Sequence, residues 1–173
     1  MTPRLRQLAL TAHVTSSVGW LGAVASSLVL AVAGLTSQDP QTVRAVYLTM
    51  ELIGWYVLIP FSLASFLTGL VQSLGTTWGL FQHYWVLAKF LINLFAAVVL
   101  LLYMQTLGFL ASVAAETTPS GDLRGLRDPS PVLHGGAALL LLLVATVLAV
   151  YKPRGITRYG RRKHHERRTA FGR

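Results

Sequence analysis

The stretch Trp78-Gly-Leu-Phe-Gln-His-Tyr-Trp-Val-Leu-Ala-Lys-Phe-Leu-Ile-Asn-Leu94, which continues in mostly apolar residues beyond Met104, decides the fold class. Its first part is aromatic, and such rings settle at the boundary between lipid and water because they are apolar with a polar edge. About 28 largely apolar residues follow, more than the roughly 20 that a helix needs to cross a bilayer. We therefore expect a membrane-spanning helix that begins in an interfacial turn formed by Trp78, Phe81, Tyr84 and Trp85, with Lys89 one turn further on.

The rest of the chain repeats this composition. Of its 173 residues 53% are hydrophobic and only 12% are charged, about half the charged fraction of a typical soluble domain. The apolar residues form four blocks, at about 8–35, 43–74, 84–112 and 132–151, rather than periodic stripes. The sequence predicts an all-α fold, a four-helix transmembrane bundle over residues 1–151, followed by a basic tail over residues 152–173.

The first block has an alternative interpretation as a signal peptide, because Ala31-Val-Ala33 resembles a cleavage site. The apolar core of a secretory signal is roughly 7 to 15 residues long, and this block is much longer, so we expect a retained span. Small residues recur along it every four positions, which lets a neighbouring helix approach closely. They are Gly19, Ala23, Ser27 and Ala31.

Two features of the other blocks predict local structure. Pro60 lies near the middle of the second block, where it removes one backbone hydrogen bond and frees the carbonyl of Tyr56, so we expect a kink there. The segment 115–131 mixes both charges with proline and glycine, which is typical of a solvated connector, although it is also long enough to form a contact site.

The charge distribution predicts orientation. Residues 152–173 hold nine Lys or Arg and one Glu, a net of +8 out of the total of +9. Because loops rich in Lys and Arg stay in the cytoplasm, we expect both termini there, in a multi-pass protein of the cell membrane. Anionic lipid headgroups are the expected partners of the tail, and nucleic acid is not expected because lipid is the nearer polyanion. The densest charges are Arg161, Arg162, Lys163, Arg167 and Arg168.

Polar residues inside the spans are costly and demand a partner. Lys89 is expected to extend to the cytoplasmic headgroups, which its long side chain permits. Glu51 and His134 fall at one level near the outer side, which predicts either a structural hydrogen bond or a metal or proton-relay site. Met104 lies at the same level, and together with His134 and Met50 it offers the soft ligands that suit copper(I).

Two histidines nearer the cytoplasm suggest a cofactor. Haem b between spans needs two imidazoles at one depth on opposite faces of the ring, and His13 with His83 are the candidates. The alternative is that these histidines only donate hydrogen bonds between helices.

Several functional classes are excluded or disfavoured. The chain has no cysteine, which excludes disulfides, thiolate metal sites and thiol-based redox relays such as those of quinone-linked four-helix oxidoreductases. It also has no His-Glu-x-x-His zinc motif, no glycine-rich phosphate loop and no Ser-His-Asp pattern, so a self-contained hydrolase is not expected.

Two segments carry a resemblance to a known family. The stretches Ser73-Leu-Gly-Thr-Thr-Trp-Gly-Leu-Phe-Gln-His-Tyr-Trp-Val-Leu-Ala-Lys89 and Val150-Tyr-Lys-Pro-Arg-Gly-Ile-Thr-Arg-Tyr-Gly-Arg-Arg-Lys163 resemble small four-span membrane proteins of actinobacteria, a family of unknown function. The resemblance implies the fold and the membrane but no activity. In addition, His13 followed by Gly19-Trp-Leu-Gly22 is similar to the first span of copper-resistance D-type membrane domains.

Three functional hypotheses follow. The first is a membrane protein that binds haem b or takes part in membrane redox chemistry. The second, from a different class, is a non-catalytic membrane or interaction protein with structural histidines. The third is a small transporter or metal-handling protein, which with four spans would act as a homo-oligomer.

Overall fold

The computed structural model describes residues 2–75, 80–116, 124–153 and 155–162. Its main helices are α1 (Pro3–Thr36), α2 (Pro40–Ile53), α3 (Ile59–Gly75), α4 (Tyr84–Glu116) and α5 (Ser130–Tyr151). A π-helical turn, η1 (Gly54–Leu58), joins α2 to α3, and a short 3-10 turn, η2 (Arg124–Leu126), precedes α5. The described residues contain no strand, only one isolated β-bridge.

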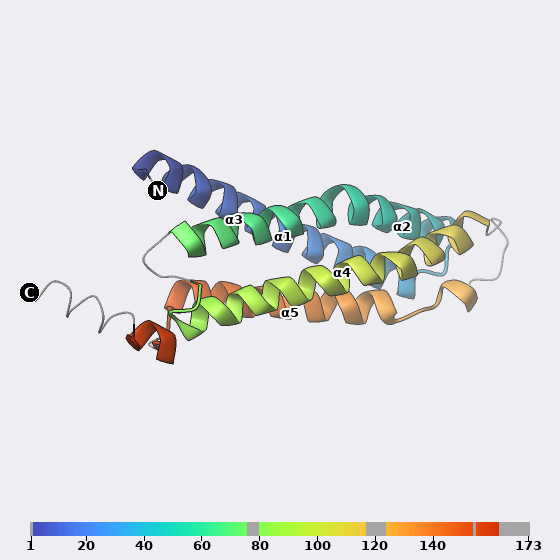
Figure 1. Ribbon diagram of the computed structural model, residues 1–173. Helices are drawn as coiled ribbons and strands as arrows, with labels where there is room; N and C mark the ends of the chain where they lie inside the picture. Colours follow the sequence, from blue (N-terminus) through green and yellow to red (C-terminus); the bar gives the residue numbers. More distant parts are fainter. Residues whose placement is uncertain (1, 76–79, 117–123, 154, 163–173) are drawn as a thin grey trace, which may run out of the picture.

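Four helical units are long and apolar enough to cross a membrane: α1, the continuous unit Pro40–Gly75, α4 and α5. The predicted fold class, an all-α bundle with four candidate spans, is therefore confirmed. Figure 1 shows the start of α1 and the segment 155–162 at the same end of the bundle, which we call the terminal end. The opposite end, with the α1–α2 connection and η2, is called the loop end. Which end faces the cytoplasm stays a prediction.

Helix α1 packs antiparallel along the whole of the second span, and its small residues allow this close approach. Near the loop end, a side chain at Gly34 would meet Val46 at 3.0 Å, and towards the terminal end one at Gly19 would meet the Phe61 ring at 2.9 Å. Between these points Ala31 is buried in a cluster with Met50. The predicted small-residue stripe of α1 thus lies against its neighbours.

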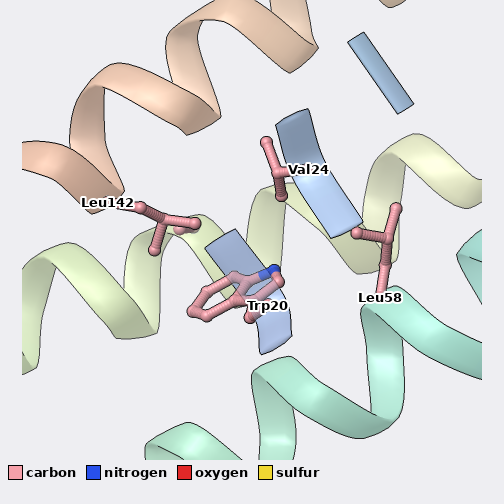
Figure 2. Close-up of a cluster of buried hydrophobic side chains, with 5 residues drawn as sticks. Trp20, Val24, Leu58 and Leu142 are labelled. Atoms are coloured by element: carbon pink, nitrogen blue, oxygen red, sulfur yellow. The ribbon is translucent and has the colours of Figure 1, made fainter. Parts of the chain in front are cut away.

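The bundle centre is filled by interlocking apolar side chains from all four spans. Trp20 is only 2% exposed, and Figure 2 shows it with Val24 of α1, Leu58 of η1 and Leu142 of α5. Burying large apolar side chains between helices gives the dispersion contacts that hold membrane helices together, since lipid removes the hydrophobic driving force.

The second span contains a π-turn directly before Pro60 that the sequence did not predict, and the kink expected at the proline stays a prediction. The N–H of Ile59 donates to the carbonyl of Gly54, five residues back, so the helix widens into the π-turn η1. The irregular hydrogen bonding therefore lies directly before Pro60, the residue that has no N–H to donate to a regular helix. Gly54 lets the Met104 side chain approach, because an added Cβ would lie 2.6 Å from Sδ and Cε of Met104 and would make that side chain move.

The loop end is closed by the segment that leads into α5. Leu126 is 1% exposed and packs in a buried cluster with Val43 and Tyr47. The Tyr47 hydroxyl donates to the Leu126 carbonyl at 2.7 Å. Arg127 donates to the carbonyls of Leu35 and Ser37, at the end of α1 where helical partners are lacking. The expectation of a solvated connector is therefore wrong for 126–127, while 117–123 lie outside the described residues.

The α1–α2 connection is organised by Asp39, which caps α2. Its carboxylate accepts a hydrogen bond from the Thr42 hydroxyl at 2.6 Å and further ones from the N–H groups of Thr42 and Gln41. These donors, the hydroxyl first, hold the pKa of the Asp39 carboxyl below its usual value because they stabilise the charged form.

Changing Tyr47 to Phe tests the closure of the loop end. The substitution leaves the buried Leu126 carbonyl without its donor, so the free energy of unfolding should fall by about 1 to 3 kcal/mol. Thermal unfolding in detergent measures the change. The control is Tyr56→Phe on the same span, because Tyr56 is 77% exposed. Equal effects of the two substitutions would contradict the cap.

Candidate functional site

His13 lies at the interface of α1 with α3. Its Nδ1 is 3.1 Å from the Ser65 carbonyl and 3.2 Å from the Thr68 hydroxyl oxygen. Because a carbonyl only accepts, Nδ1 carries the proton and donates, which leaves the lone pair on Nε2. Gly69 makes room for the ring, since an added Cβ would lie 3.0 Å from Cε1 of His13.

His13 belongs to a series of hydrogen bonds that links α1 to α3 over the terminal half of the bundle. The Gln72 amide donates to the Ala9 carbonyl at 2.8 Å, and the hydroxyls of Ser17 and Ser65 share a hydrogen bond of 2.8 Å. We call this series the α1–α3 ladder. The sequence singled out His13, but it did not identify Ser65 or Gly69 of α3 as residues that contact it.

His83 lies elsewhere, in the turn that precedes α4 at the terminal end. Its backbone forms an isolated antiparallel bridge with Ile156, and its ring centroid is 6.4 Å from that of Trp85. His13 therefore faces α3, whereas His83 belongs to a pairing between the α4 turn and the tail. Haem ligation by the two histidines stays a prediction.

Glu51 is half-buried on α2 and faces α4. Its Oε1 lies 3.5 Å from the position that a Cβ on Gly108 would occupy. Within the described residues, its carboxylate has neither a hydrogen bond nor an ion pair. Glycine at 108 thus provides the space in which the carboxylate rests on the backbone of α4.

His134 is exposed on α5 and contacts the other side of α4. Its Nδ1 is 2.9 Å from the Ser130 carbonyl, and its ring stacks on Tyr103 with centroids 4.1 Å apart. The Ser130 hydroxyl completes this group by donating to the Tyr103 hydroxyl oxygen at 3.0 Å.

The expected hydrogen bond between Glu51 and His134 is not formed in the part of the chain described. On α4, Gly108 and Tyr103 are five residues apart and so point about 140° apart, which directs one contact towards α2 and the other towards α5. Met104 is buried with Met50 and packs against Gly54, towards α2. No group of three or more His, Asp or Glu that could hold a metal occurs among the described residues; a site that includes Met104 stays a prediction.

The expected interfacial residues gather at the terminal end. Phe81 and Tyr84 are exposed, and Nζ of Lys89 lies 6.0 Å from the centre of the Trp85 ring. The Asn93 amide donates to the Lys89 carbonyl at 2.9 Å, so its polarity is satisfied within α4. Arg161 and Arg162 are exposed. The remaining residues of these predictions, Trp78, Lys163, Arg167 and Arg168, lie outside the described residues.

Sequence reasoning missed the folding of the tail onto the α4 turn. The N–H of Thr157 donates to the Gln82 carbonyl at 2.9 Å, and the N–H of Tyr84 donates to the Gly155 carbonyl at 3.3 Å. The two segments that carry the family resemblance therefore contact one another. Comparison of the chain with protein-family models, curated proteins and solved structures gives no match.

The separation of Glu51 from His134 can be tested by mutation. Glu51→Gln, His134→Ala and the double variant should change the free energy of unfolding additively, to within about 0.5 kcal/mol, because the two side chains share no partner. Thermal unfolding in detergent gives the three values. A larger interaction energy would mean that the residues are coupled. Tyr103→Leu combined with His134→Ala serves as the positive control, since those two rings stack.

Proposed function

We propose that this chain is a non-catalytic integral membrane protein that acts through contacts with lipid and with other membrane proteins. The observation that carries the proposal is the hydrogen bonding of His13, whose Nδ1 donates to Ser65 and Thr68 of the neighbouring helix. A histidine used in this way is part of helix packing, as polar side chains in membrane bundles commonly are.

Most of the other polar groups that the structure describes in the bundle support the same proposal, and the carboxylate of Glu51 is the exception. The α1–α3 ladder and the Tyr103–Ser130–His134 group are internally hydrogen bonded. Within the described residues, Ser27 carries the buried side-chain oxygen that has no partner. A transport pathway would need a row of polar groups along the bundle axis, and no observation on the described residues favours one.

Charge separation supports lipid as a partner. The described acidic residues, Asp39, Glu51, Glu116 and Asp128, all belong to the loop half of the bundle. Most of the described basic residues lie at the terminal end, whereas Arg44 and Arg127 belong to the loop half. Those at the terminal end are Arg4, Arg6, Lys89, Lys152, Arg158, Arg161 and Arg162. Such an asymmetry suits an anionic cytoplasmic leaflet at the terminal end and both termini in the cytoplasm.

A second candidate, haem b binding, has one observation in its favour. Histidines that bind metals commonly donate their other ring N–H to a carbonyl, which fixes the tautomer. His13 does so through Ser65, and Nε2 keeps its lone pair. In this hypothesis His83 would be the second ligand, and the chain would take part in membrane redox chemistry.

Haem absorbance and stability, measured on the unmutated chain and two His13 variants, distinguish a structural histidine from a haem ligand. The full-length chain is purified from cells supplied with a haem precursor, next to His13→Ala and His13→Gln. A structural histidine predicts no Soret band in the unmutated protein. It also predicts a loss of about 0.5 to 1.5 kcal/mol in His13→Ala, because the hydrogen bond between α1 and α3 is lost while the Thr68 hydroxyl keeps its bond to the Ala64 carbonyl. The loss should be smaller in His13→Gln, whose amide still donates.

A Soret band that disappears in both variants would contradict the structural reading, since glutamine replaces the hydrogen bond but does not ligate haem iron in this way. His134→Ala is the matched control, because that histidine is exposed on α5, bonds to Ser130 of its own helix and stacks on Tyr103 of α4.

A further inference from the structure

The segment 155–162, which we call the docked tail, is fixed to the turn before α4 by main-chain hydrogen bonds. Besides the two bonds between Thr157 and Gln82 and between Tyr84 and Gly155, the Thr157 hydroxyl donates to the carbonyls of Phe81 and Gln82. Figure 1 shows the short helical turn of this segment beside the start of α4. The first part of the basic tail is therefore a folded element with a defined position.

Two residues hold the docked tail in place. The buried Thr157 makes the bonds described above, and its hydroxyl oxygen also accepts a hydrogen bond from the N–H of Gly160 at 3.0 Å. A Cβ on Gly160 would lie 2.5 Å from the Gln82 carbonyl oxygen, closer than real contacts allow. Because the obstacle is backbone, no side chain fits at this position unless the tail moves away.

The outward surface of this element combines aromatic and basic side chains. Phe81, Tyr84, Ile156 and Tyr159 are exposed, and Arg158 and Arg161 are exposed between and beside them. Aromatic rings prefer the level of the lipid headgroups, and arginine forms bidentate hydrogen bonds with phosphate. A surface of this composition at the end of a membrane span is therefore better suited to contact with lipid headgroups than to exposure to bulk water.

The surrounding charge also favours an anion. Figure 1 shows the start of α1, which carries Arg4 and Arg6, at the same end of the bundle, and the described acidic residues belong to the other half. Negative charge from outside the described chain would balance these positive charges. In the membrane, the nearest source is the leaflet at the terminal end.

We propose that the docked tail is a binding site for the phosphate headgroup of an anionic phospholipid, formed by Arg158 and Arg161 with Tyr84 and Tyr159 beside them. Docking fixes the backbone of Arg158 and Arg161, which are three residues apart on one helical turn, so that binding depends on the fold of the segment as well as on its charge. The site deepens the proposed contact with lipid and does not depend on whether His13 binds haem.

The test compares two glycine substitutions that leave the charge unchanged. Full-length protein in detergent micelles is titrated with phosphatidylglycerol and with phosphatidylcholine, and bound lipid is counted by native mass spectrometry. We expect the unmutated protein to prefer phosphatidylglycerol and Gly160→Ala to lose most of this preference, because its Cβ expels the docked tail. Gly155→Ala should keep it, since its Cβ would meet only the Tyr84 side chain at 3.5 Å.

Removal of charge provides the second arm. Arg158→Gln with Arg161→Gln should weaken binding of phosphatidylglycerol about 30-fold, because each basic residue near an anionic surface contributes about 1 kcal/mol and 1.4 kcal/mol corresponds to a factor of ten. Thr157→Val, which loses the hydroxyl but keeps the shape, should weaken it in the same direction as Gly160→Ala. Circular dichroism and thermal unfolding confirm that each variant retains the bundle.

Three results would overturn the proposal. One is an unchanged lipid preference in both Gly160→Ala and Thr157→Val, which would mean that charge alone attracts the lipid. Another is unchanged binding after the double arginine substitution. The third is displacement of the lipid by an equal concentration of inorganic phosphate, which would assign the site to the free anion. A Soret band that depends on His13 would contradict the proposed function while leaving these lipid measurements unaffected.

Discussion

The absence of water from the hydrocarbon core is the constraint on which this structure depends. A polar group in that region is stabilised by a partner inside the bundle, and the α1–α3 ladder supplies such partners. The Nδ1 atom of His13 is within hydrogen-bond distance of the Ser65 carbonyl and the Thr68 hydroxyl. The Gln72 amide donates to the Ala9 carbonyl. The ladder fixes the register between α1 and α3, which apolar packing alone would specify less sharply. It also occupies the Nδ1 atom of His13 with a structural hydrogen bond.

The same constraint acts on the backbone. Pro60 lacks an N–H, and the π-turn η1 lies directly before it in the second span. The π-turn begins at Gly54, where the absence of a Cβ lets Met104 approach. At the loop end, the last carbonyls of α1 receive the guanidinium of Arg127 from a segment far away in the sequence. The π-turn lies beside Gly54 and the end of α1 lies beside Arg127. At both points a neighbouring residue compensates for the irregular backbone.

Apolar length made the four spans predictable, because roughly 20 apolar residues have no other stable location. Depth along a helix could be estimated too, and Lys89 and the aromatic turn do lie together at one end. Depth does not give direction around a helix axis, however. Glu51 and His134 were expected at one level, yet they contact different faces of α4, because Gly108 and Tyr103 face different neighbours. The docked tail could not be predicted for another reason. No sequence pattern marks Thr157 and Gly160 as contact residues, and a run of arginines has the same composition whether the segment is folded or not.

Both ends of the bundle are covered by segments that return to it, in the parts of the chain described. Leu126 fills the loop end between α2 and α4, and the docked tail covers the turn before α4 at the terminal end. Between them, the core is packed with side chains such as Trp20. The chemically distinct surfaces of the bundle are those at its two ends. The loop end carries the described acidic residues together with Arg44 and Arg127, whereas the terminal end carries most of the described basic residues. The proposed recognition of anionic lipid is therefore best sought at the terminal end.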